Sequence, residues 1–189
     1  MSRVITLLIA SAVLLTACAK PEALLPRDDV VPAGVDLSGK WKIRADMVDE
    51  QRQLQAAIRK TSGARSSSGS RNSKPRKVSG GVVHVFLETG ELLKVTQTAD
   101  GLFISFDRSV VEEFRFGEQR VVSVGEVQAQ RVTGWEGQRL IIETLDDHGV
   151  KLTDRFQLAD NGQTLRREIT LRSKKHEERS VTQEFDRVE

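Results

Sequence analysis

Hydrophobic and polar residues alternate along most of the chain after Leu37. In the stretch "GKWKIRA", Trp41 and Ile43 alternate with Lys42 and Arg44, which is typical of a strand with one buried face. After Gly81, similar short runs follow one another, separated by turn residues. We expect eight to eleven strands, from these segments: Trp41, Val83 to Glu88, Leu92 to Thr98, Leu102 to Asp107, Val110 to Phe116, Arg120 to Val124, Gln128 to Thr133, Arg139 to Leu145, Lys151 to Leu158, Thr164 to Arg172 and Val181 to Arg187.

Turn sequences between these runs predict how neighbouring strands pair. Asp100-Gly101 and Asn161-Gly162 are signals for two-residue hairpin turns. Asp147-His148-Gly149 fits a three-residue loop with glycine at the positive-φ position. The predicted pairs are Gln97 with Ile104, Val95 with Phe106, Ile142 with Asp154, Asp154 with Ile169, Phe156 with Arg167, Leu158 with Leu165 and Leu152 with Leu171.

Sequential hairpins at this short and even spacing favour an antiparallel meander. Closure of such a meander into a barrel would remove its exposed strand edges. We therefore predict an all-β fold, an antiparallel up-and-down barrel of lipocalin type with one short inserted helix. The barrel domain is expected over residues 36–189, which is long enough for one domain with a core.

The helix and a basic loop are expected at about residues 49–79. In "DEQRQLQAAIRK", Leu54, Ala57 and Ile58 have helical spacing and Asp49 can cap the start. The loop that follows is rich in Ser, Gly, Lys and Arg, and we expect it to be mobile. Its basic residues could contact an anionic envelope surface such as phospholipid headgroups, or the loop could be a solvated insertion; they include Arg65, Arg71, Lys74, Arg76 and Lys77.

Several motifs of the predicted barrel resemble a widespread group of bacterial exported proteins. They are "DLSGKWKI", "LLKVTQTADGLFISF", "GWEGQRLIIET", "DRFQLADNGQTLRREITL" and "VTQEFDRV". The resemblance covers most of Leu37 to Val188 and implies a small lipocalin-like barrel of uncharacterised function, with no catalytic residues to carry over. The chain departs from this group by the insertion at about Asp49 to Ser79.

The N-terminus has the plan of an export signal. Arg3 is followed by an apolar run that carries no charge until Lys20 and is shorter than a membrane span. The stretch "LTAC", ending at Cys18, resembles the bacterial lipobox, which implies cleavage before Cys18 and lipidation of its thiol. Residues 1–17 are then a lipoprotein signal peptide. The alternative is an ordinary secretory signal that contains a cysteine by chance.

Cys18 is the only cysteine, so the chain cannot form an internal disulfide, and lipidation gives this odd cysteine a role. Several acyl chains would hold the protein firmly in a membrane. By resemblance to lipoprotein sorting, Ala19 in place of aspartate implies the periplasmic face of an outer membrane. Residues 18–35, with Pro21, Pro26 and Pro32, are expected to form a flexible tether.

Charge and composition narrow the possible partners. The chain has 29 Lys and Arg against 27 Asp and Glu, and removal of residues 1–17 removes one basic residue, Arg3. The mature chain is therefore nearly neutral, which gives no support for nucleic-acid binding. Tyrosine is absent and aromatic residues make up 5%, which disfavours an aromatic-lined sugar or nucleobase site.

The sequence gives no assembled set of catalytic or metal-binding residues. His84, His148 and His176 fall in different predicted elements. The stretch "HEERS" lacks the second histidine of the zinc-protease motif, because position 180 is Ser. We therefore expect no enzyme activity, no cofactor and no metal site.

Charged and polar residues on predicted inward faces are the best candidates for a site. Burial of a charge is costly unless the charge is paired. In the predicted registers, Asp154 and Arg167 are diagonal neighbours on one face. With Gln97 they could form the polar end of a ligand cavity, or Asp154 and Arg167 could be a satisfied ion pair that plugs the barrel.

Two function classes remain open. The first is a non-catalytic binding or docking module for a small amphipathic ligand or an envelope component, anchored on the outer membrane. The second is an envelope enzyme that acts on lipid or cell-wall material with unidentified carboxylates. An open apolar interior would favour ligand binding, and a filled interior would favour a docking or structural role.

Overall fold

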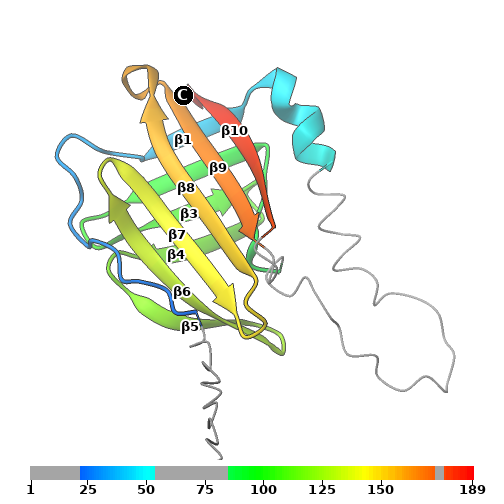
Figure 1. Cartoon of the computed structure of the whole chain (residues 1–189). Helices are drawn as coiled ribbons and strands as arrows, with labels where there is room; N and C mark the ends of the chain where they lie inside the picture. Colours follow the sequence, from blue (N-terminus) through cyan, green and yellow to red (C-terminus); the bar gives the residue numbers. More distant parts are fainter. Residues whose placement is uncertain (1–21, 54–84, 173–176) are drawn as a thin grey trace, which may run out of the picture.

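A computed structural model of the chain describes residues 22–53, 85–172 and 177–189. Ten strands dominate these residues (Figure 1). They are β1 (Gly39–Ile43), β2 (Leu92–Gln97), β3 (Gly101–Phe106), β4 (Val110–Arg115), β5 (Gln119–Val124), β6 (Val127–Glu136), β7 (Arg139–Asp146), β8 (Lys151–Ala159), β9 (Thr164–Arg172) and β10 (Glu178–Val188).

The ten strands form one antiparallel sheet in the order β4-β3-β2-β1-β10-β9-β8-β7-β6-β5. Every ladder but one joins strands that follow one another in the chain. The exception is the ladder between β1 and β10. Figure 1 shows the sheet curling over, so that β1 to β4 face the strands β6 to β9. The predicted all-β, up-and-down antiparallel architecture is confirmed.

Two of the predicted hairpins have the expected register. Phe156 pairs with Arg167 and Asp154 with Ile169 in β8 and β9, and Ile142 pairs with Asp154 across β7 and β8. The β2–β3 register was wrong by two residues, since Gln97 pairs with Leu102. The reason is the position of the turn: the Thr98 N–H donates to the Gly101 carbonyl at 2.8 Å, so the two central turn residues are Ala99 and Asp100, one residue earlier than predicted.

Two further predictions need correction where the structure describes them. Residues 85–88 are not part of a strand, because residues 85–86 form a 3-10 turn and the next residues are irregular. The inserted helix starts before Asp49: a 3-10 turn over Ala45–Met47 leads into helical residues 48–53. The rest of the predicted helix and the basic loop lie outside the described residues.

The inner face of the sheet forms the main hydrophobic core. Alternate residues of each strand point inward, and the buried side chains include Trp41, Ile104, Phe156 and Phe185. A second cluster around Phe86 lies near one end of the barrel. The barrel is therefore filled by its own side chains along most of its length.

The sheet is not a fully hydrogen-bonded barrel, because β4 and β5 are its two edges. Side chains cross the gap between them: Arg120 donates to the Glu113 carbonyl at 2.9 Å, and Arg131 of β6 pairs with Glu112 of β4 at 3.3 Å. The exposed outward residues here are Val111 of β4 and Val121 of β5.

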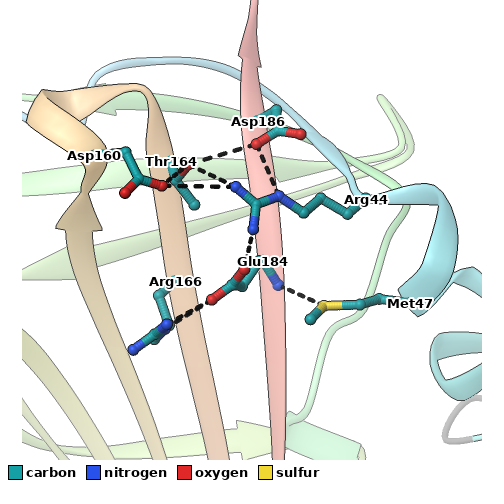
Figure 2. A network of polar contacts seen from close by, with 7 residues as sticks. All are labelled: Arg44, Met47, Asp160, Thr164, Arg166, Glu184 and Asp186. Carbon is teal, nitrogen blue, oxygen red and sulfur yellow. Dashed lines mark hydrogen bonds and ion pairs between the residues drawn. The ribbon is translucent and has the colours of Figure 1, made fainter.

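Arg44 ties the helical insertion to the outer side of β9 and β10 (Figure 2). Its guanidinium donates to Asp186 at 3.0 Å and to Thr164 at 3.0 Å, and it also pairs with Glu184. Arg166 donates to the same Glu184 carboxylate. This cluster lies outside the barrel and fixes the chain where β1 ends.

Residues 22–31, which we call the strap, lie along the outer face of β6 and β7. Leu24 is buried in a cluster with Val132 and Leu145. The Trp135 N–H of β6 donates to the Asp28 carbonyl at 2.8 Å. Part of the segment predicted as a flexible tether over residues 18–35 is therefore packed on the folded domain.

Candidate functional site

The polar centre of the barrel interior is an ion pair between Asp154 of β8 and Arg167 of β9. The guanidinium Nε and Nη2 donate to the carboxylate, at 2.9 and 2.5 Å for the closest atoms. Arg167 is 1% exposed and Asp154 is 8% exposed. The Asp154 carboxylate thus compensates the buried Arg167 charge in a bidentate geometry.

Arg167 has three further partners: the Glu88 carbonyl, the Phe106 ring of β3 and the Phe156 ring of β8. Its Nη2 donates to the Glu88 carbonyl at 2.9 Å. Its guanidinium carbon lies 5.3 Å from the Phe106 ring centre and 5.2 Å from that of Phe156. These cation–π contacts stabilise the charge away from water. Nη1 is buried and has no hydrogen-bond partner among the residues that the structure describes.

A second buried arginine, Arg131 of β6, repeats this arrangement. It pairs with Glu112 at 3.3 Å, donates to the Thr144 hydroxyl at 3.2 Å and lies over the rings of Phe86 and Phe114. No local pattern in the sequence indicates this pair, because β4 and β6 are not neighbours in the sheet.

Burial dominates the electrostatics of the Arg131–Glu112 pair. Burial raises the pKa of Glu112, although the charge of Arg131 opposes this effect. Burial also lowers the pKa of Arg131, against the opposing charge of Glu112. Both groups are thus shifted toward their neutral forms, so their mutual attraction does not fully offset the loss of hydration.

Little space remains among these side chains. The cavity bounded by Glu112, Arg131, Asp154 and Arg167 has a free volume of about 10 Å³. A single water molecule needs roughly that much room. Among the described residues, this central cavity therefore has space for about one water molecule and none for an acyl chain or a comparable ligand in this conformation.

The structure brings together only two of the three predicted ligand residues. Gln97 lies apart from Asp154 and Arg167: its side chain accepts from the Leu37 N–H at 3.0 Å and donates to the Val35 carbonyl at 3.1 Å. It thus holds the segment before β1. Cys18 and the basic residues Arg65, Arg71, Lys74, Arg76 and Lys77 lie outside the described residues.

One group of potential metal ligands occurs among the described residues: Asp146, Asp147 and His148 offer atoms within 4.8 Å of one another. Their contacts close the turn between β7 and β8. Asp146 Oδ1 accepts from the N–H groups of His148 and Val150 at 2.9 and 2.8 Å, and His148 contacts the exposed Asp147. His84 and His176 lie outside the described residues.

A groove of about 330 Å³ follows the gap between β4 and β5. Glu112, Arg120 and Arg131 line it, together with Val121, Val122 and Phe86. The guanidinium of Arg131 and the carboxylate of Glu112 lie between this groove and the central ion pair, because both line the groove and the inner cavity.

No protein family model matches the chain. No curated protein matches it either. Among solved structures, a secretory abundant heat soluble protein from Ramazzottius varieornatus is similar, with 11% identity and a TM-score of 0.47 over 80% of this chain and 94% of that chain. A fatty acid binding protein from Schistosoma mansoni, in complex with arachidonic acid, has 14% identity and a TM-score of 0.46 over 81% and 96%. The fluorescent protein UnaG has 15% identity and a TM-score of 0.44 over 80% and 96%.

These similarities say nothing about what this chain binds, because identity and TM-score are both low. Within the described ranges, no helix is long and apolar enough to cross a membrane.

Proposed function

We propose that this protein is a non-catalytic docking module of the bacterial envelope, anchored through lipidated Cys18 on the periplasmic face of the outer membrane. The observation that carries the docking role is the filled interior. Its two arginines are paired with its own carboxylates and aromatic rings, and the central cavity that they border has a free volume of about 10 Å³. Recognition then takes place on the outer surface of the barrel.

The anchoring part of the proposal rests on the sequence around Cys18. An uncharged apolar run precedes it, "LTAC" resembles a lipobox, and no second cysteine is available for a disulfide. Contact of the basic loop residues with an anionic surface stays a prediction that depends on this location.

Fractionation and ligand titration test the two parts separately. The full chain, expressed in a two-membrane bacterium, should incorporate labelled palmitate and sediment with the outer membrane, whereas Cys18→Ser should do neither. The purified protein should show no saturable binding of a fluorescent fatty acid. Saturable binding that is lost in Arg167→Met would instead make the protein a carrier with Arg167 in its ligand site.

A further inference from the structure

The strap is held on the barrel wall by contacts along its whole length. Leu24 is 4% exposed and packs with Val132 of β6 and Leu145 of β7. Asp28 forms an isolated antiparallel bridge with Trp135. Gly134, beside Trp135, makes room for this bridge, because a Cβ there would lie 2.4 Å from the Asp28 carbonyl oxygen.

Ion pairs fix the strap at its first residue, Glu22, and at Arg27. Arg27 donates to the Glu143 carboxylate at 2.8 Å, and Glu143 also accepts from Lys151 at 3.1 Å. Glu22, the first described residue, pairs with Arg172 and lies 3.7 Å from the Lys151 ammonium group. Lys151 begins β8 and Arg172 ends β9, so Glu22 is held at one end of the barrel.

The chain length before Glu22 limits where the lipid can be. Four peptide steps separate Cys18 from Glu22, and a fully extended chain spans at most about 14 Å over that length. The strands are longer: β6 has ten residues and spans roughly 30 Å. From Glu22, therefore, Cys18 cannot reach the far end of the barrel.

The turns at the two ends of β6 and β7 define two rims. The near rim contains turn residues 125–126 and 147–149, at the same end as Lys151 and Arg172. The far rim contains turn residues 137–138 and 160–163. In Figure 1 the strap, in blue, starts near the end of the sheet at which the arrow of β7 points, which is the near rim.

We propose that the strap orients the barrel on the membrane, with the near rim facing the lipid surface in which Cys18 is embedded and the far rim facing away from it. This inference rests on the proposed lipidation of Cys18. Because the strap is bound to the barrel, only a few residues separate the lipid on Cys18 from the folded domain. The membrane surface is therefore the partner of the near rim. The far rim and the β4–β5 gap are not restricted by the link.

Single-cysteine labelling tests the orientation directly. Once the Cys18 sulfur carries its lipid, an introduced cysteine is the only free thiol of the mature chain. Glu126→Cys and Gln138→Cys place exposed thiols in the turns at the two ends of β6. The full lipidated protein, labelled with a fluorophore, is reconstituted into phosphatidylethanolamine–phosphatidylglycerol vesicles that contain headgroup spin-labelled lipid. Quenching should be several-fold stronger at position 126 than at position 138.

A lengthened tether is the matched control. A twenty-residue Gly/Ser linker inserted between Pro21 and Glu22 adds about 25 Å of root-mean-square length and leaves the strap residues unchanged. The difference between the two labels should disappear while the protein stays bound to the vesicles. Equal quenching at both positions without the linker would overturn the orientation alone. Failure of the unmodified chain to bind vesicles would overturn both the orientation and the proposed anchoring.

Discussion

At the scale of single residues, two buried arginines make the centre of the barrel interior polar. Arg167 and Arg131 each pair with one carboxylate and lie against two phenylalanine rings. A buried guanidinium is costly unless it is compensated in this way. Because the barrel's own carboxylates pair with both guanidinium groups, neither arginine is a buried charge without a counter-charge.

The Asp154–Arg167 pair should be a structural pair. Arg167→Met should lower the free energy of unfolding by about 3–5 kcal/mol, because it leaves the Asp154 carboxylate buried without its partner. The double variant Arg167→Met with Asp154→Leu should recover much of that loss, since neither charge remains. Urea unfolding of the wild type, both single variants and the double variant measures this cycle. A loss below about 1 kcal/mol in both single variants would mean that the pair does not hold the interior together.

Sequence reasoning found Asp154 and Arg167 because both lie in one hairpin whose register follows from the Asn161-Gly162 turn. It could not find Arg131, whose partners come from β4 and from residue 86, beyond the hairpins that local patterns define. Gln97 was on the expected strand but binds the backbone before β1, a tertiary contact with no periodic signal.

At the scale of elements, turn chemistry decided how well strand pairing could be predicted. The β7–β8 and β8–β9 registers followed from their turns. The turn after β2 is centred on Ala99 and Asp100, one residue earlier than predicted, and this shifts the β2–β3 ladder by two residues. A register shift of two residues keeps every side chain on its predicted face of the sheet. The prediction of which side chains point into the core was therefore unaffected. The strap was missed because its sequence has no strand or helix periodicity, and it is held by ion pairs and one backbone bridge.

Attachment of the strap should weaken in acid because of Glu143. Burial alone would raise the pKa of Glu143, but hydrogen bonds from Arg27 and Lys151 outweigh burial and lower this pKa below its ordinary value of 4.5. The carboxylate therefore stabilises the folded strap above about pH 4.5, and this contribution is lost as the pH falls through the lowered pKa.

Hydrogen exchange of residues 22–31 at pH 7 and below pH 4 measures this effect. Protection in the wild type should fall on acidification. In Glu143→Gln, the strap amides should already be less protected at pH 7, by about 1–3 kcal/mol in the free energy of local opening. Their protection should also change less with pH than in the wild type. Equal loss of protection in both proteins would assign the acid sensitivity to another group, such as Glu22.

At the scale of the whole molecule, the chain forms a curled ten-stranded sheet with a filled interior and an anchoring segment folded onto its wall. The alternating pattern predicted this architecture well, because most strands bury one face; β7 is buried on both faces and β5 has no buried residue. Whether the barrel holds a ligand could not be predicted, since that depends on how side chains from six strands and from residues 86 and 88 fill the same small space.

Native mass spectrometry of the full protein, extracted from its membrane in mild detergent, tests both the lipid anchor and the filled interior. We expect the mass of residues 18–189 plus the acyl groups on Cys18, with no further small molecule bound. An unmodified Cys18 would contradict the anchoring. A stoichiometric small molecule that is retained under native conditions and lost on unfolding would contradict the filled interior.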